Sequence, residues 1–380
     1  MPASSAQLHP SAALVAEIGA EIGAVSVAGE GCIADPDAAP ARPAAPGSRQ
    51  PPLTAADYRP ARWLRNPHVQ SALGSSGLRR RVGERGLAAS GAVTSEHLID
   101  AGDGVRLLGL HSAIPGAAPR GLVLLLHGWE GSVDSSYMRL TAAQMLARGF
   151  EVFRLNFRDH GNTHHLNEGL FHSNRIDEVV RAACEVARRF PLRPMTVAGY
   201  SLGGNFALRL ALHAPAAGLA LAHVAAVCPV LDPARTMDAM EQGLPLYMWY
   251  FERRWRQSLV RKRALFPHQT GFDDRALGLR MRPLTQWMVE HHTDFGTLER
   301  YFEGYSIAGD RLAALQVPVS ILMAEDDPVI PIDGFRALRL PPGSTLEISP
   351  WGGHCGFIES KQLNGFAERW IAQRLAAAVG

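Results

Sequence analysis

The sequence predicts an α/β protein in which helices cover both faces of a mostly parallel central sheet. Apolar runs such as 122–126 are continuous rather than alternating, which is typical of strands buried on both faces. Segments with helical periodicity separate these runs, so strand and helix alternate along the chain. A Gly-x-Ser-x-Gly turn at 199–203 joins one such strand to a helix. Together these observations favour one large sheet with a serine exposed at its edge.

The composition is ordinary for a soluble globular protein. Of the 380 residues, 47% are hydrophobic and 19% are charged, and the formal net charge is +2. This charge gives no reason to expect nucleic-acid binding. The four cysteines form no Cys-x-x-Cys pair, so we expect a reducing compartment, and thus the cytoplasm, rather than a disulfide framework. No apolar segment is long enough to span a bilayer.

The N-terminal segment 1–55 is expected to be a poorly ordered tail. It is rich in Ala, Pro, Gly and Ser, and 40–52 has almost no residues that favour regular structure. A short helix is possible at 12–19, but it is not a convincing signal peptide because Glu17 and Glu21 interrupt the apolar run. The folded domain is therefore predicted at 56–380.

The segment 63–71 is dense in residues that fix a backbone. Asn66-Pro67 favours a turn followed by the start of a helix. His68 and Gln70 invite a catalytic interpretation, but a structural role as loop anchors is favoured. Two strands are then predicted around a Gly-rich turn. The expected elements up to the middle of the chain are strands at 93–100, 105–111, 122–126, 150–157, 195–198 and 224–228, and helices at 137–148 and 176–190.

Ser201 is predicted to be a nucleophile. The sequence Gly199-Tyr200-Ser201-Leu202-Gly203 fits the nucleophile elbow, where glycines let a strand and a helix approach closely. The backbone N–H of Leu202 lies at the start of the following helix, where negative charge is stabilised. A second oxyanion donor is expected at the N–H of Trp129, in the glycine-bearing loop after strand 122–126. His127 is interpreted as bracing this loop.

The histidine-rich loop 159–172 is expected at the rim of the pocket. Its histidines match no known zinc-ligand spacing, and Gly161 breaks any helical register between His160 and His164. A hydrogen-bonded loop is therefore favoured over a metal site. Within it, His160 is a candidate substrate-binding residue.

Residues 233–311 are predicted to form a helical lid insertion, because the strand rhythm is lost there. Trp249 and Trp255 are candidate substrate-binding residues in this segment, and the aromatic and Met side chains could line an acyl pocket. The arginines from 253 to 263 could lie on an anionic membrane surface. The alternative is that the aromatic residues only pack the lid on the body and the arginines are solvated.

The remaining catalytic candidates follow two further strands, at 317–323 and 344–349. Asp327 is predicted to be the orienting acid, with Asp326 and then Asp232 as less favoured choices. Glycines flank His354, which lets the loop carry this predicted base over Ser201. Cys355 is interpreted as a small filler. A closing helix is expected at 363–378.

In this order, the motifs resemble the YheT-like branch of the alpha/beta hydrolases from about Tyr58 to the end. The sequences that carry the resemblance are Asn66-Pro67-His68-Val69-Gln70, His127-Gly128-Trp129-Glu130-Gly131-Ser132, Gly199-Tyr200-Ser201-Leu202-Gly203-Gly204-Asn205, Asp326-Asp327-Pro328 and Gly352-Gly353-His354. The chain departs from that branch at 158–161, which leaves the choice of substrate open.

The resemblance implies hydrolysis of carboxylic esters without a cofactor. Short- or medium-chain esters and acylglycerol-type lipids are the expected substrates, and Ser201, Asp327 and His354 match the family's catalytic triad. Two alternatives stay open. The fold could carry other acyl chemistry, as in a thioesterase, perhydrolase or lyase, or it could serve a non-catalytic binding protein.

Overall fold

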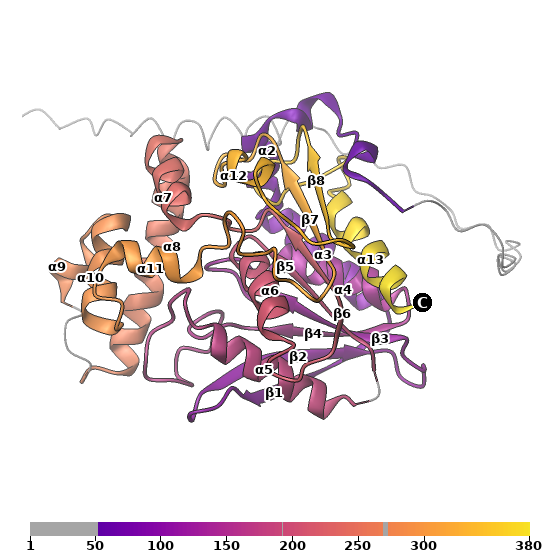
Figure 1. Cartoon of the computed structure of the whole chain (residues 1–380), viewed down its shortest axis with the longest axis horizontal. Coiled ribbons are helices and arrows are strands. Elements are labelled where there is room, and N and C mark those ends of the chain that lie inside the picture. The colour runs from indigo at the N-terminus through magenta and orange to yellow at the C-terminus, as the bar shows by residue number, and fades with distance from the viewer. Residues whose placement is uncertain (1–51, 192, 269–272) are drawn as a thin grey trace, which may run out of the picture. The chain divides into compact units, whose positions relative to one another are not determined.

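The computed structural model describes residues 52–191, 193–268 and 273–380. Most of the predicted tail, including its possible helix, therefore lies outside the described residues. Figure 1 shows one central sheet flanked by helices in the unit that runs from Pro52 to Gly380. Residues 53–55, which the sequence assigned to the tail, dock on this unit: the N–H of Leu53 donates to Gln373, and that of Ala55 donates to Glu347.

The eight strands form one sheet in the order β1-β2-β4-β3-β5-β6-β7-β8. The pairs β1–β2 and β2–β4 are antiparallel, and every other neighbouring pair is parallel, so the mostly parallel sheet is confirmed. The strands span β1 Val93–Asp100, β2 Arg106–Ala113, β3 Gly121–Leu126, β4 Phe150–Leu155, β5 Met195–Tyr200, β6 Leu221–Val227, β7 Val319–Ala324 and β8 Thr345–Ser349. All residues of β3, β4, β5 and β7 are buried, which explains the continuous apolar run of β3. β4 also buries two charged residues, Glu151 and Arg154.

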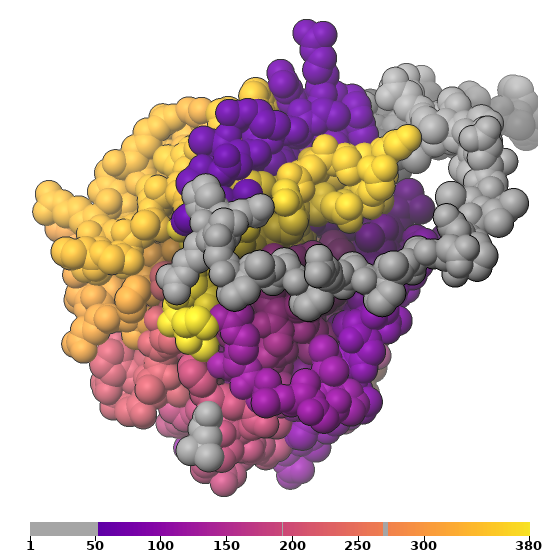
Figure 2. Space-filling model, turned by 90° about the vertical axis from the view of Figure 1, so that its right-hand side faces the viewer, coloured from indigo at the N-terminus to yellow at the C-terminus, as the bar shows by residue number. Residues whose placement is uncertain are grey.

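Helices cover both faces of the sheet, as predicted. α4 (Ser136–Leu146) and α13 (Phe366–Val379) pack on one face, and α5 (Ile176–Arg189) and α6 (Leu202–His213) pack on the other. α3 (Gly77–Ala89), which the sequence did not predict, packs on α4. A buried ion pair between Arg79 and Glu368, 2.6 Å apart, joins α3 to α13. Figure 2 shows α13, in yellow, beside the indigo start of the described chain.

Among the described residues between β6 and β7, within the predicted insertion, there are five helices. They are α7 (Pro233–Gln242), α8 (Pro245–Leu265), α9 (Asp274–Leu277), α10 (Met281–His292) and α11 (Leu298–Tyr305). In Figure 1 they gather to one side of the sheet. The short helices α2 (Pro67–Gly74) and α12 (Asp333–Arg336) complete the fold, with two 3-10 turns at Ala55–Asp57 and Arg62–Arg65. In the described part of the chain, we find no helix with both the length and the apolar character needed to cross a bilayer.

At the turn from β5 to α6, the backbone packs closely against the end of β3. A Cβ atom added to Gly199 would overlap the carbonyl oxygen of Gly203, and one added to Gly203 would overlap that of Leu126. Only glycine fits at these two positions, as the Gly-x-Ser-x-Gly pattern predicted. Between them, Ser201 adopts φ 54° and ψ −119°, a conformation uncommon for a residue with a side chain.

We expect Gly203→Ala to lower the free energy of unfolding by at least about 1–3 kcal/mol, because the new methyl group meets rigid backbone. Gly77→Ala is the matched control. Gly77 also lies in the first turn of a helix, but an added Cβ there would meet no atom within 4 Å. Urea denaturation of both variants measures the difference. Equal free energies of unfolding would contradict the close approach described here.

Candidate active site

Three side chains meet at the carboxyl edge of the sheet, on the segments that follow β5, β7 and β8. His354 Nε2 lies 2.9 Å from Ser201 Oγ, and His354 Nδ1 lies 2.8 Å from Asp327 Oδ2. An ionised carboxylate only accepts, so His354 Nδ1 carries the proton and Nε2 accepts from the Ser201 hydroxyl. The structure thus brings together the three residues proposed from the sequence as nucleophile, base and acid, with His354 hydrogen-bonded to both of the others. This arrangement is able to deprotonate the serine.

The carboxylate of Asp327 is held by the backbone that follows it. Its Oδ1 accepts the N–H groups of Val329 at 2.8 Å and Ile330 at 3.0 Å. The two other acids considered from the sequence have different partners. Asp326 Oδ1 accepts the N–H of Gly353 at 2.9 Å, and Asp232 caps α7. Asp326 therefore shapes the loop that carries the histidine and does not contact the imidazole.

The loop of His354 rests on α2. The N–H of His354 donates to Ser71 Oγ at 2.9 Å, and this hydroxyl donates to the carbonyl of Pro67 at 2.7 Å. Gly353 has φ 53°, and a Cβ atom on it would overlap the Pro67 carbonyl. The sequence analysis did not identify Ser71, although it lies in the segment 63–71 that it described as fixing the backbone. Gln70 is buried and hydrogen-bonded, which agrees with its structural interpretation.

Several titratable groups around Ser201 have shifted pKa values, and two of them, His354 and Glu130, bear on proton transfer at this site. Burial, the largest single effect, lowers the pKa of His354. The charge of Asp327, that of Cys355 and the hydrogen bond to Asp327 together outweigh burial, so the pKa rises from 6.5 to about 9. Burial raises the pKa of the Glu130 carboxyl to about 7. Cys355 is buried and its thiol donates to the Val227 carbonyl, in line with its interpretation as a filler.

The loop after β3 brings Trp129 beside the serine. A Cβ atom on Gly128 would lie 3.4 Å from Ser201 Cβ, so the two segments are in van der Waals contact. Among the described residues, neither the N–H of Trp129 nor that of Leu202 has a hydrogen-bond acceptor. Two backbone donors without an acceptor, one in the loop after β3 and one directly after Ser201, are suited to stabilising an oxyanion.

Two side chains hold this loop in place. His127 Nδ1 donates to the Gly128 carbonyl at 2.8 Å, and its Nε2 accepts the N–H of Phe157 at 3.2 Å. The Tyr137 hydroxyl accepts the N–H of Gly128 at 2.9 Å. His127 therefore links the segments after β3 and β4, which is the bracing role expected from the sequence.

Ser201 opens into two cavities of different character. One has a volume of about 440 Å³ and is mostly polar, with Glu130, Asn162, Arg254 and Arg261 on its walls. The other has a volume of about 100 Å³ and is mostly apolar, with four methionines, Met237, Met240, Met281 and Met288, among its lining residues. Trp129 and Phe251 line both cavities, and their rings stack with centroids 5.4 Å apart.

The structure separates the two tryptophans that the sequence proposed for substrate binding. Trp255 is 7% exposed, lines the apolar cavity and packs edge-on against Trp129. Trp249 is 55% exposed and lines neither cavity that Ser201 opens into. The two residues lie on α8 six positions apart, so they face in different directions.

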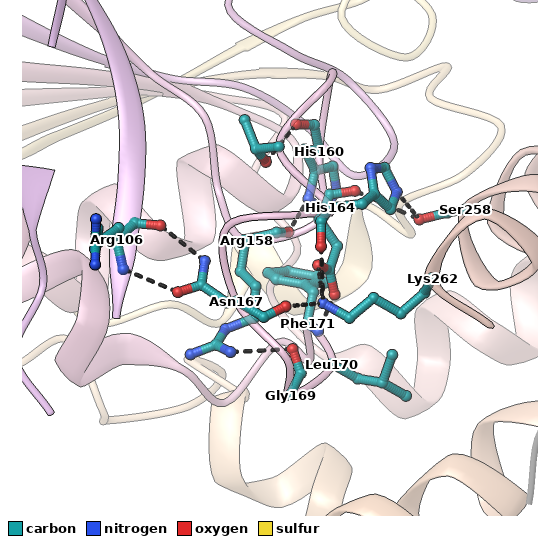
Figure 3. Close-up of polar contacts among 12 residues, drawn as sticks. Arg106, Arg158, His160, His164, Asn167, Gly169, Leu170, Phe171, Ser258 and Lys262 are labelled. Carbon is teal, nitrogen blue, oxygen red and sulfur yellow. Dashed lines mark hydrogen bonds and ion pairs between the residues drawn. The ribbon is translucent and has the colours of Figure 1, made fainter. Parts of the chain in front are cut away.

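The histidine-rich loop is held to α8 by a buried ion pair (Figure 3). Lys262, 1% exposed, lies 2.7 Å from Asp159 Oδ1 and also donates to the carbonyls of His164 and Asn167. The other oxygen of Asp159 accepts the N–H of Phe171 at 2.9 Å. His164 Nε2 lies 2.7 Å from the hydroxyl of Ser258, which also comes from α8.

His160 lies inside this loop and lines the polar cavity. It is 3% exposed, and its Nδ1 donates to the Arg158 carbonyl at 2.7 Å (Figure 3), while its Nε2 has no partner among the described residues. No set of three or more His, Cys, Asp or Glu side chains within 52–191, 193–268 and 273–380 is arranged to hold a metal ion. The geometry matches the hydrogen-bonded loop favoured from the sequence.

Comparison with known proteins adds a family and several relatives. The family described as "Serine aminopeptidase, S33" matches residues 117–360. "Putative esterase slr0264" of Synechocystis sp. is 27% identical over 306 residues, which cover 71% of this chain and 80% of that protein. "Putative esterase YheT" of Escherichia coli K12 is 26% identical over 265 residues, 67% of this chain and 74% of that protein.

Among solved structures, the esterase Pf2001 of Pyrococcus furiosus is similar, with a TM-score of 0.51. The likeness covers 77% of this chain and 91% of that chain at 16% sequence identity. At this level of identity, the likeness concerns the fold alone.

Proposed function

Because the chain belongs to the serine aminopeptidase S33 family of alpha/beta hydrolases, in its YheT-like branch, we propose that it cleaves carboxylic esters through an acyl-enzyme on Ser201. The observation that carries the proposal is the chain of contacts from Ser201 through His354 to Asp327. It lies where two cavities meet, so an ester bond at the serine has room on both sides.

The mechanism follows from the hydrogen bonds. His354 Nε2 takes the Ser201 proton as the oxygen attacks the acyl carbonyl, and Asp327 stabilises the imidazolium that forms. The N–H groups of Trp129 and Leu202 receive the negative charge on the carbonyl oxygen. His354 then protonates the leaving alcohol, and a water molecule activated by the same imidazole hydrolyses the acyl-enzyme.

We assign the two halves of the ester to the two cavities at Ser201. The apolar cavity under the insertion helices is suited to the acyl chain, with Trp255 on its wall. Apolar cavities of roughly 150 Å³ accept a molecule of benzene size, so about 100 Å³ suits an acyl chain of a few carbons. The larger polar cavity is suited to the alcohol, and His160 lines it.

Ser201→Ala is expected to lower kcat for p-nitrophenyl butyrate by at least about 10⁴-fold, because a triad without its nucleophile retains only binding and oxyanion effects. Ser132→Ala is the matched control, since Ser132 lines the same polar cavity without contacting His354. Steady-state assays measure both variants, and labelling by a fluorophosphonate should vanish only in the first. Undiminished turnover in Ser201→Ala would refute the proposal.

The choice of scissile bond is tested on the unmodified protein. We expect p-nitrophenyl and aliphatic esters to be turned over faster than thioesters of the same acyl group and faster than aminoacyl p-nitroanilides. A preference for thioesters would assign the other acyl chemistry left open by the sequence. A preference for the anilides would assign peptidase activity, and no turnover of any of these would favour a binding protein.

We expect kcat/KM to increase towards alkaline pH. The midpoint of this increase, the alkaline limb of the pH profile, should lie above the ordinary imidazole pKa of 6.5. His354 must be neutral to act as a base. Its pKa is about 9, because the Asp327 charge, with the Cys355 charge and the hydrogen bond to Asp327, outweighs the lowering by burial. Asp327→Asn removes that charge, so it should move the limb to lower pH as well as lower the rate.

Glu130 supplies the control for this assignment, because its carboxyl titrates near pH 7 in the same cavity. In Glu130→Gln the limb should stay where it is. Disappearance of the limb in that variant would reassign it to Glu130, and a limb unmoved by Asp327→Asn would argue against the proposed acid.

Met288→Ala is expected to shift the ratio of kcat/KM values towards longer acyl chains by about tenfold, because it enlarges the apolar cavity. Met145→Ala is the matched control: Met145 is equally buried, but it lies in α4 and lines neither cavity. A series of p-nitrophenyl esters of increasing length measures the ratio. The same profile in both variants would place the acyl chain elsewhere.

A further inference from the structure

α8 has one face that packs on the rest of the protein. Its buried side chains follow one helical stripe, at 248, 252, 255, 259 and 262. Trp255 of this stripe lines the apolar cavity, and Lys262 reaches the histidine-rich loop. The stripe includes Glu252, the only acidic residue of α8, so no carboxylate of this helix lies on its opposite side.

The opposite side of α8 is unusually apolar for an exposed helix. Nine large hydrophobic side chains are exposed among the described residues, and five of them lie between Leu244 and Leu265. We call the outer face of α8 the exposed surface formed by Trp249, Tyr250, Arg253, Arg254, Val260, Arg261 and Leu265. Trp249 is 55% exposed and Val260 45%. Such a concentration marks an interaction site more often than an ordinary surface.

The three arginines of this outer face have no carboxylate partner within the described residues. Arg253 lies over the ring of Trp249, 5.7 Å from its centroid. Arg254 donates to the Glu130 carbonyl, and Arg261 donates to the Gly161 carbonyl and to Asn162. None of the three forms a direct ion pair within the described residues, although Arg254 lies close enough to the Glu130 carboxyl to lower its pKa. Lys262 and Arg263, in contrast, are paired with Asp159 and Asp274.

We propose that the outer face of α8 docks on an anionic lipid surface. Tryptophan and tyrosine rings favour the boundary between acyl chains and headgroups, and arginines among them bind phosphate groups. A basic face that also carries Trp, Tyr, Val and Leu fits this boundary, because both kinds of side chain find partners in one plane. An acidic protein partner would also pair with the arginines, but its charge would not account for the exposed apolar side chains of this face.

The outer face continues into the proposed active site. Tyr250, Arg254 and Arg261 belong to both the outer face and the wall of the polar cavity that holds Ser201. A lipid surface bound to this face would lie at the cavity's edge. Docking would therefore bring the cavity close to ester substrates dissolved in, or carried by, that surface.

The test uses the full chain and sedimentation with vesicles of equimolar phosphatidylglycerol and phosphatidylcholine, alongside vesicles of phosphatidylcholine alone. We expect binding to the anionic vesicles only, and loss of that binding as salt is raised. The double variant W249A/R253A should bind about tenfold more weakly, since it removes one ring and one charge from the interface. Neither residue lines a cavity that Ser201 opens into.

W63A/R62A is the matched control, because Trp63 is as exposed as Trp249 and also neighbours arginines. It should bind vesicles like the unmodified protein. Equal weakening in both double variants, or failure of the unmodified protein to bind, would overturn the proposal. If the unmodified protein binds no vesicles but self-associates, and W249A/R253A loses that self-association, the face would instead be assigned to contact with a second copy of the chain.

Turnover of a water-soluble ester separates this proposal from the proposed function. It should be unchanged in W249A/R253A, which also shows that the variant is folded. An inactive but vesicle-binding protein would refute ester hydrolysis and leave the docking surface standing.

Discussion

The close approach of two backbone segments at the end of the sheet governs the geometry of this protein. Where β5 turns into α6, there is room for hydrogen atoms alone at Gly199 and Gly203, and Ser201 is held at positive φ between them. The same approach sets the loop after β3 beside the serine, with Trp129 and Leu202 presenting free N–H groups. The proposed nucleophile and the two proposed oxyanion donors are thus positioned by packing of the main chain, which is stiffer than any side-chain contact.

Much of this arrangement could be predicted from the sequence, because its causes are local. Strands buried on both faces are rich in apolar residues, so the runs at 122–126 and 195–198 were recognisable without knowing their neighbours. The elbow is encoded in five consecutive residues. The order of Ser201, Asp327 and His354 followed because each comes directly after a strand, and parallel strands end at one edge of a sheet.

What the sequence could not give depends on contacts between distant segments. α3 is rich in arginine and has no clear apolar stripe, yet Arg79 is buried because Glu368 lies opposite it. Ser71 supports His354 across 283 positions of sequence. The rotation of α8 was equally hidden, since its aromatic residues occur all around the helix. Trp255 lies on the buried stripe of α8 together with Lys262, which is bound to Asp159, whereas Trp249 lies on the exposed side.

That lysine constrains how a substrate reaches the serine. Its ammonium group is almost fully buried and donates to three acceptors from one loop. Moving the whole of α8 away from the loop as a rigid body would therefore break a buried ion pair, at a cost of several kcal/mol. A displacement of α8 that keeps this ion pair would leave the Lys262 end of the helix in place. It would be confined to the other end, around Tyr250 and Phe251, which line the polar cavity. The buried ion pair of Lys262 and Asp159 thus anchors one end of α8 to the histidine-rich loop.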